Sequence, residues 1–157
     1  MVTLRRAQLE DREAIWRVFT RSVRGLARSH YTPEQIEAWA GLRQPEDFTN
    51  AIEHHEFFVA EEVGEIVGYG QLNPGTAEVE AVYIVPEVTG RGVGRLLMEA
   101  LEAKAREAGL ASLRLRASLN AVAFYEHFGY RIERREMHPL PDGVEFAVAQ
   151  MTKTLSS

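Results

Sequence analysis

Residues 85–95 of this 157-residue chain read Val-Pro-Glu-Val-Thr-Gly-Arg-Gly-Val-Gly-Arg, the most informative stretch of the sequence. It follows a run rich in β-forming side chains at 79–85 and precedes a helical pattern at 95–108. Three glycines at alternate positions therefore join a strand to the N-terminus of a helix. The free backbone N–H groups and positive dipole end of such a helix suit an anion, which glycine allows to approach closely. The alternative is a tight turn that holds no ligand.

The spacing of these glycines separates the known kinds of phosphate-binding loop. The glycines are Gly90, Gly92 and Gly94. A Walker A loop needs Gly-Lys-Ser/Thr at the start of its helix, but here Gly94 is followed by Arg95 and Leu96. The dinucleotide fingerprint Gly-x-Gly-x-x-Gly needs its last glycine where this chain has Arg95 or Leu97. The spacing therefore argues against an ATP or NAD loop.

The remaining pattern resembles the acyl-CoA pyrophosphate loop of the GNAT superfamily of N-acetyltransferases, usually Arg/Gln-x-x-Gly-x-Gly/Ala. Here the segment reads Thr89-Gly90-Arg91-Gly92-Val93-Gly94, so Thr89 stands where that family prefers Arg or Gln. Backbone amides do most of the cradling in the family, and Arg91 and Arg95 could supply the positive charge. The resemblance implies a pyrophosphate site formed by Thr89, Gly90, Arg91, Gly92, Val93, Gly94 and Arg95.

A second motif follows one helix and one strand later, Asn120-Ala121-Val122-Ala123-Phe124-Tyr125-Glu126-His127-Phe128-Gly129-Tyr130. Its residues alone favour a short helix capped by Asn120, with Phe124, Tyr125 and Phe128 as core aromatics. The stretch also resembles the second GNAT motif in its Asn, Phe-Tyr and Gly-Tyr elements. The resemblance implies that Asn120 meets the pantetheine arm and that Tyr125 lies beside the thioester sulfur.

Acetyl transfer to an amine requires a proton acceptor. An amine of pKa ~10.4 is protonated at neutral pH, and a nearby carboxylate, directly or through water, can take its proton. Glu78 and Glu80 precede the loop on one strand and, by the period of two, are expected to share a face with Val82 and Ile84. The alternative is a solvated edge position. The sequence does not separate the two glutamates, and we favour Glu80.

The leaving group and the oxyanion also need stabilisation. Tyrosine, with an ordinary pKa of ~10, stays protonated and can donate to the departing CoA thiolate, a role that we assign to Tyr125. A backbone N–H near Val82, Tyr83 and Ile84 is expected to stabilise the tetrahedral oxyanion. Direct attack in a ternary complex needs no covalent enzyme intermediate, which agrees with the lack of cysteine.

Composition narrows the class of protein. With 45% hydrophobic and 26% charged residues, the chain is globular, and we expect residues 1–157 to form a single domain. The absence of cysteine excludes disulfides and thiolate metal sites and fits a cytoplasmic location. The histidines lack metal-ligand spacing, so we expect no metal. A net charge of −5 with dispersed basic residues argues against nucleic acid, and no apolar stretch predicts a signal peptide or membrane span.

The patterns predict a defined order of elements. Asp11 is expected to cap a helix over 11–26, and Thr32 and Gln35 to form a capping box, with Pro33 in the first turn, at the start of a short helix over 32–40. Further helices are expected over about 45–54, over 95–108 with Gly109 at its C-cap position, and over 120–128. Strands are expected over 57–61, 65–72, 77–85 and 113–117, with a closing hairpin of 130–137 and 144–155. This order predicts an α/β (α+β) domain with a central mixed, mostly antiparallel sheet flanked by helices. It is similar to the GNAT fold.

The acceptor is less well defined by the sequence. Residues 30–40 look like a segment of small bacterial GNAT proteins that lines the acceptor pocket, so His30, Tyr31 and Trp39 are candidate contacts. We predict an N-acetyltransferase that moves the acetyl group of acetyl-CoA to a primary amine of a small molecule or peptide. The alternative is a non-catalytic acyl-CoA-binding module. A homodimer remains open as the assembly.

Overall fold

The computed structural model of the chain describes residues 1–140 and 143–155. Its helices are α1 (Arg12–Leu26), α2 (Pro33–Ala40), α3 (Thr49–His54), α4 (Val93–Glu107) and α5 (Val122–His127). Short 3-10 turns are η1 (Leu9–Asp11), η2 (Pro45–Phe48), η3 (Pro86–Val88) and η4 (Leu119–Ala121). The strands are β1 (Val2–Arg6), β2 (Glu56–Glu62), β3 (Glu65–Asn73), β4 (Glu78–Ile84), β5 (Ser112–Ser118), β6 (Arg131–Pro139) and β7 (Glu145–Thr154). Pro141 and Asp142, in the predicted hairpin turn, lie outside the described residues.

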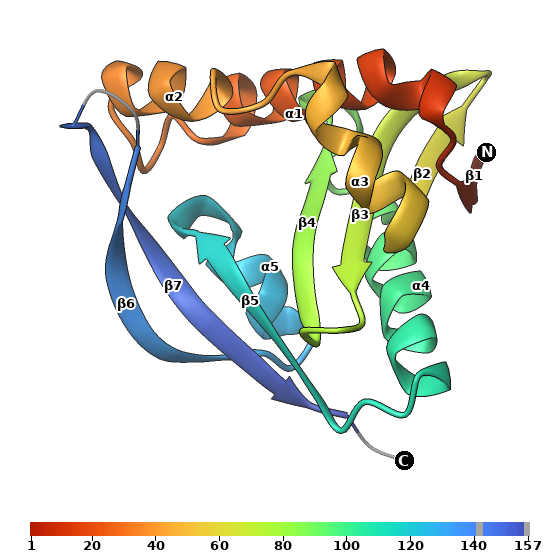
Figure 1. Cartoon of the computed structure of the whole chain (residues 1–157). Coiled ribbons are helices and arrows are strands. Elements are labelled where there is room, and N and C mark those ends of the chain that lie inside the picture. Colours follow the sequence, from red (N-terminus) through yellow and green to blue (C-terminus); the bar gives the residue numbers. More distant parts are fainter. Residues whose placement is uncertain (141–142, 156–157) are drawn as a thin grey trace.

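The strands form one seven-stranded sheet in the order β1-β2-β3-β4-β5-β7-β6 (Figure 1). Every neighbouring pair is antiparallel except β4 and β5, which are parallel. That parallel pair is joined at a single register position, Glu78 opposite Arg114, and the two strands diverge beyond it. The predicted mixed, mostly antiparallel sheet is confirmed. Its split between β4 and β5 leaves space for a cavity between these two strands.

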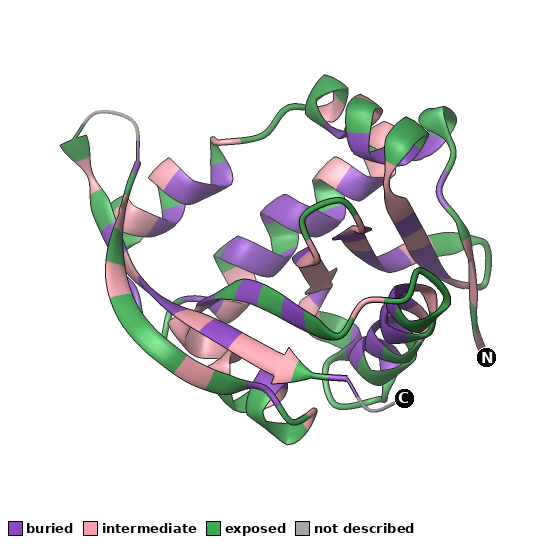
Figure 2. Cartoon of the chain, turned by 60° about the horizontal axis from the view of Figure 1, so that its bottom comes forward, coloured by how far each residue is buried: buried purple, intermediate pink, exposed green. Residues whose placement is uncertain are grey.

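Helices cover both faces of the sheet. On one face, α1 and α3 pack on β2, β3 and β4, and α2 packs on α1; on the other, α4 crosses β2, β3 and β4. Alternation along β3 explains this arrangement, since the buried Tyr69 faces the first layer while Gly68 and Gly70 lie against Leu97 and Leu101 of α4. Buried and exposed residues also alternate along β5 (Figure 2). The strands contribute to two buried clusters, one that joins residues of α1, α2 and α3 to the first turns of α4, and one that joins the rest of α4 to β5, α5 and β7.

Strand β1 was not predicted, and it changes the interpretation of Asp11. The sequence suggested that Asp11 caps the first long helix, but its side chain makes no cap hydrogen bond to α1. Instead the buried carboxylate accepts hydrogen bonds from Arg5 at 2.8 and 2.9 Å and from the Gln8 backbone N–H at 2.8 Å. The Arg5 guanidinium is the main reason that the pKa of Asp11 is lowered. Asp11 thus ties β1 to the start of α1.

Several local predictions are confirmed. Thr32 and Gln35 form the expected capping box at the start of α2, with bonds of 2.9 and 3.1 Å and Pro33 in the first turn. Gly109 follows α4 with a positive φ of 77°, as expected for a glycine after a helix C-terminus. In the described part of the chain, no helix has the length and apolar character needed to cross a bilayer.

Candidate active site

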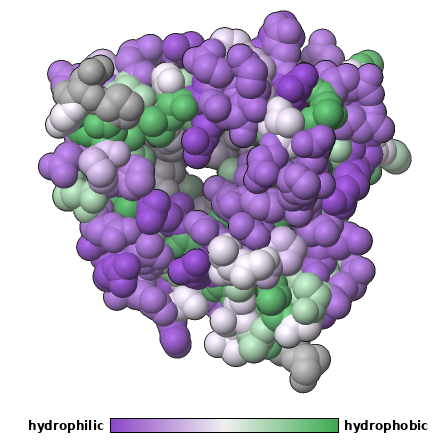
Figure 3. Space-filling model, in the orientation of Figure 1, coloured by the Kyte–Doolittle hydropathy of each residue, from purple (hydrophilic) through white to green (hydrophobic). Residues whose placement is uncertain are grey.

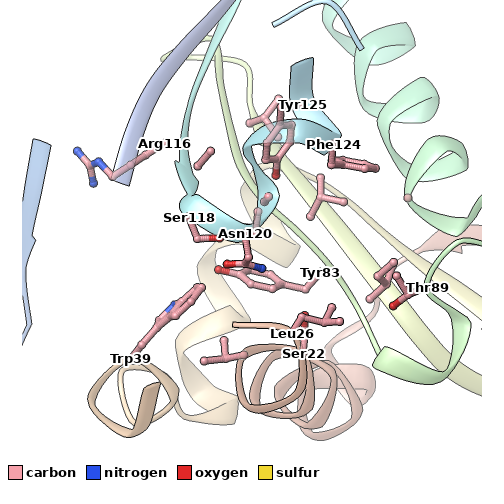
Figure 4. A pocket seen from close by; sticks show the side chains of 18 of the residues that line it. Ser22, Leu26, Trp39, Tyr83, Thr89, Arg116, Ser118, Asn120, Phe124 and Tyr125 are labelled. Carbon is pink, nitrogen blue, oxygen red and sulfur yellow. The ribbon is translucent and has the colours of Figure 1, made fainter. Parts of the chain in front are cut away.

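A cavity of about 260 Å³ lies where β4 and β5 separate. Its walls come from β4, β5, η4, α5, the glycine loop and the inner sides of α1 and α2 (Figure 4). Polar and aromatic side chains from distant parts of the sequence converge here, among them Trp39, Tyr83, Asn120 and Tyr125. The space-filling view shows the same region as a hollow through the middle of the molecule (Figure 3).

The glycine loop adopts the conformation expected of an anion site. Gly90 and Gly92 have φ angles of 82° and 85°, in the left-handed region that favours glycine, and each faces open space where a Cβ would stand. The first hydrogen bond of α4 joins Leu96 N–H to the Gly92 carbonyl at 3.1 Å. Because the described residues provide no side-chain cap at Gly92, the preceding N–H groups remain available to a ligand.

Gly94 has a different reason to be glycine. Its φ is not in the left-handed region, but a Cβ there would lie 2.7 Å from Cε1 and 2.9 Å from Cζ of Phe124. Phe124 in turn packs edge-to-face on Tyr125 and Phe128, with ring centroids 5.1 and 5.0 Å away. Gly94 therefore lets α5 dock against the first turn of α4 and links the two sequence motifs.

The other loop residues differ in what they offer a ligand. Thr89 lines the cavity, and Val93 is buried in the core, so only its backbone faces the loop. Arg91 is ion-paired with Glu62 on β2, which compensates its charge. Arg95 is exposed in the first turn of α4, with its guanidinium 5.8 Å from the Phe128 ring centre and 3.9 Å from the exposed carboxylate of Glu99. Its ion pair is longer than that of Arg91, so Arg95 is the less tightly paired of the two predicted cations.

Asn120 is placed differently from the prediction. It lies inside the 3-10 turn η4 and is not the N-cap of a helix, a position that Ser118 holds for η4 and Ala121 for α5. Its Oδ1 atom is buried with no hydrogen-bond partner among the described residues, although the side chain lines the cavity. An unsatisfied buried acceptor costs about 1–3 kcal/mol, which a ligand N–H would relieve.

Tyr125 combines a packing role with access to the cavity. Its ring is buried against Phe124 and Tyr130, while its hydroxyl points into the cavity (Figure 4). Burial, and to a lesser degree nearby Tyr83, raises the pKa of Tyr125 above its ordinary value. The hydroxyl therefore stays protonated and can act as a hydrogen-bond donor.

A β-bulge in β4 corrects the predicted face of the two glutamates. Gln71 pairs with Ala81 and Leu72 with Val79, so Glu80 is the extra residue in the ladder. Val82 and Ile84 lie on the α4 face, opposite Gly70 and Gly68. The bulge shifts the alternation, so that Glu80 instead joins Ala81 and Tyr83 on the α1 and α3 face. The expectation that Glu78 and Glu80 share a face with Val82 and Ile84 was therefore wrong.

A second cavity of about 260 Å³ lies on that other face of β4. Aromatic rings that include Phe48, Tyr69 and Tyr83 form its walls, and polar groups that include Arg43 and Asp47 open onto it. Four residues line both cavities, namely Trp39, Glu80, Ala81 and Tyr83. Burial raises the pKa of Tyr83 to about 12, so its hydroxyl is neutral between the two spaces.

Comparison with known proteins assigns this architecture. Residues 27–154 match the family described as an acetyltransferase (GNAT) domain. The chain belongs to the GNAT family. It is 31% identical over 142 residues to the uncharacterized N-acetyltransferase YjgM of Escherichia coli, covering 81% of this chain and 80% of YjgM. The protein is thus an N-acetyltransferase by family, and the prediction of an acyltransferase is confirmed.

Solved GNAT structures agree with the fold. A GCN5-related N-acetyltransferase from Rhodopseudomonas palustris superposes with a TM-score of 0.91 at 31% identity, covering 98% of this chain and 95% of that one. The PaiA N-acetyltransferase of Thermoplasma acidophilum, in complex with coenzyme A, has a TM-score of 0.78 at 23% identity, with 99% of each chain covered. The second likeness supports the fold alone.

The three candidate acceptor contacts of this GNAT protein are not equivalent. Trp39 lines both cavities. The Tyr31 hydroxyl donates to the Ala147 carbonyl and accepts from the Leu119 N–H at 2.8 Å, so it links the connection between α1 and α2 to β7 and η4. His30 is exposed and lies 2.7 Å from the Ser29 hydroxyl. Neither His30 nor Tyr31 lines either of these two cavities, so Trp39 is the one of the three candidates that faces them.

His55 is a polar residue of this region that the sequence analysis did not predict as part of a site. His55 lines the second cavity, and its Nδ1 lies 2.8 Å from Oε1 of Glu80. The sequence offered only the adjacent pair His54-His55, which was set aside for lack of metal-ligand spacing. Within residues 1–140 and 143–155, no group of three His, Cys, Asp or Glu side chains is arranged to hold a metal ion.

Proposed function

We propose that the protein transfers the acetyl group of acetyl-CoA to a primary amine of a small molecule or peptide. The observation that carries this proposal is the junction of the two cavities at Trp39, Glu80, Ala81 and Tyr83. A thioester in the first cavity and an amine in the second would meet across β4. A non-catalytic acyl-CoA module would need only the first cavity.

The first cavity suits acetyl-CoA. Its pyrophosphate would bind the uncapped N–H groups of the loop from Gly90 to Arg95, where a helix N-terminus favours negative charge. The pantetheine arm carries amide N–H groups, and one of these would satisfy Asn120 Oδ1. The coenzyme A complex of the fold neighbour PaiA is consistent with this assignment.

The thioester would then lie along the open edge of β4. Beyond the Glu78–Arg114 pair, the described strands give this edge no partner, so backbone N–H groups near Val82, Tyr83 and Ile84 remain to stabilise an oxyanion. The amine nitrogen bonds to the thioester carbon, and the tetrahedral intermediate collapses with loss of the thiolate. Direct attack of this kind needs no covalent enzyme intermediate.

Tyr125 would serve the leaving thiolate. A hydroxyl with a raised pKa gives up its proton reluctantly, so Tyr125 would stabilise the thiolate chiefly by donating a hydrogen bond. Of the two candidate carboxylates, Glu80 lines both cavities and Glu78 lines neither, because Glu78 lies where β4 and β5 still pair. We therefore propose Glu80 as the carboxylate that serves proton removal.

The test is turnover of acetyl-CoA with a panel of alkyl amines, arylalkyl amines and dipeptides, read as free thiol released. We expect at least one acceptor to give saturable turnover. Tyr125→Phe should then lower kcat by about 10²–10⁴-fold, while the affinity for CoA, measured by calorimetry, changes little. CoA binding without turnover of any amine would favour the non-catalytic module, and full activity in Tyr125→Phe would leave this residue a packing role alone.

A further inference from the structure

We propose that His55 takes the proton from the attacking amine and that Glu80 acts through it as a positioning residue. This inference rests on the proposed acetyl transfer and names the group that performs one of its steps. The observation behind it is a chain of three polar side chains, Gln71, Glu80 and His55, at the wall of the second cavity.

The geometry of these three side chains favours one tautomer of a neutral imidazole. Glu80 Oε1 accepts a hydrogen bond from Gln71 Nε2 at 2.8 Å, and His55 Nδ1 lies 2.8 Å from the same oxygen. An ionised carboxylate has no hydrogen to give, so Nδ1 must carry the proton of the His55–Glu80 bond. The neutral ring then presents a lone pair at Nε2, which has no hydrogen-bond partner in the part of the chain that the structure describes. Nε2 is therefore the atom that can accept a proton.

The backbone holds His55 in place. At the end of α3, His55 N–H donates to the Ala51 carbonyl at 2.9 Å, and the His55 carbonyl accepts from Arg6 at 3.0 Å. Arg6 is itself paired with Glu56 at 2.8 Å, so β1 clamps the junction between α3 and β2. With its side chain only 16% exposed, His55 is held in the manner of a preorganised base.

The position of His55 agrees with this role. Glu80 lies at the junction of the cavities, whereas His55 lines only the second one, on the side from which the amine would arrive. The bulge in β4 turns Glu80 toward Gln71 and His55, because regular alternation would direct it to the α4 face. A carboxylate beside an imidazole also stabilises the imidazolium that forms when Nε2 takes a proton.

The proton balance of the step is complete. An ammonium acceptor loses one proton to Nε2, and its nitrogen then bonds to the thioester carbon as the carbon–sulfur bond breaks. Of the three ammonium hydrogens, one remains on the amide product and one ends on the CoA thiol. The third leaves to solvent, which restores neutral His55.

The test compares four variants with wild type, using acetyl-CoA and an amine that the wild-type enzyme accepts. His55→Gln should lower kcat by about 10²–10⁴-fold, the usual range for a lost general base. Glu80→Gln should cost less, since its amide oxygen can still accept from Nδ1, and the double variant should be no slower than His55→Gln. His54→Gln is the matched control, because His54 is exposed and lines neither cavity. All four should bind CoA as wild type does.

A pH series separates catalysis from loss of structure. The deficit of His55→Gln should shrink as the pH passes the pKa of the acceptor itself, ~8 for a dipeptide and ~10.4 for an alkyl amine, because free amine no longer needs a base. The other charged or titratable groups around this cavity are Arg43, Asp47, Tyr69, Tyr83 and Glu80, and His55→Gln leaves all of them in place.

The outcomes are distinct. If wild type releases no thiol with any amine, the proposed function itself fails. If wild type is active and His55→Gln matches His54→Gln, the inference is overturned while the acetyl transfer stands. A loss confined to Glu80→Gln, with His55→Gln near wild type, would make Glu80 the direct base and likewise overturn it.

Discussion

Replacing Gly92 with alanine should weaken CoA binding in a way that replacing Gly109 does not. The two glycines stand at opposite ends of α4, with φ angles of 85° and 77°, and neither has an atom within 4 Å of where a Cβ would lie. Left-handed backbone costs a non-glycine residue about 1–2 kcal/mol, partly offset by a stiffer unfolded chain. Each variant should therefore lose about 1 kcal/mol of unfolding free energy and roughly 2–4 °C in Tm.

The difference between the two variants lies in the ligand. At Gly92 the methyl group enters the open space above the loop, and relief of strain would turn the N–H groups of Val93 and Gly94 away from an anion. We expect Gly92→Ala to raise the Kd for CoA by tenfold or more, about 1.4 kcal/mol, and Gly109→Ala to change it less than twofold. Thermal unfolding measures the loss of stability in each variant, and calorimetry measures the change in Kd for CoA. Equal CoA affinities in the two variants would refute the assignment of this loop to the pyrophosphate.

Two further substitutions test how the site is supported. Gly94→Ala should reduce the free energy of unfolding by about 1–3 kcal/mol, because the new Cβ would lie 2.7 Å from the Phe124 ring. Phe124→Leu should relieve that cost, so a double-mutant cycle of unfolding experiments should show coupling between the two positions, and additive losses would contradict the contact. The pKa of Asp11 is lowered mainly by Arg5, so the folded state binds this proton less tightly than the unfolded state and the stabilisation is complete above the unfolded pKa of ~3.9. Asp11→Asn should therefore cost stability at pH 7 and progressively less as the pH falls through the folded-state pKa of Asp11, where wild type loses the same stabilisation. Denaturant unfolding at pH 7 and over the acid range measures this difference, and an equal loss at every pH would contradict it.

Local signals in the sequence were sufficient for much of the fold. The capping box of Thr32 and Gln35, the strand before the glycine loop and the amphipathic stripe of α4 each depend on residues close together in the chain. Strand β1 was not predicted from the sequence because it is short, ends in two arginines and has a burial pattern that only partly alternates. Its arginines are explained by partners far along the chain, Glu61 for Arg5 and Glu56 for Arg6.

The site was only partly predictable for the same reason. Motif spacing singled out the glycine loop, Asn120 and Tyr125 as candidates, because each motif is continuous in sequence, and the structure brings them to one cavity. The exact position of Asn120 inside η4 and its orphan oxygen depend on how α5 docks on α4, which spacing does not encode. His55 could not be distinguished from His54 by any local pattern, since what separates them is the position of Glu80, 25 residues away.

The bulge at Glu80 shows why periodicity gave the wrong face for the glutamates. A strand with strict alternation would place Glu80 with Val82 and Ile84, on the side of α4 and the proposed acyl-CoA site. One extra residue in the ladder reverses that alternation and turns Glu80 toward His55. Glu80 then lies at the junction of the two cavities, whereas Val82 and Ile84 line only the first. The proposed transfer across β4 uses both faces of this strand, and a strict period of two gives no sign of a bulge, because the extra residue is visible only in the pairing with β3.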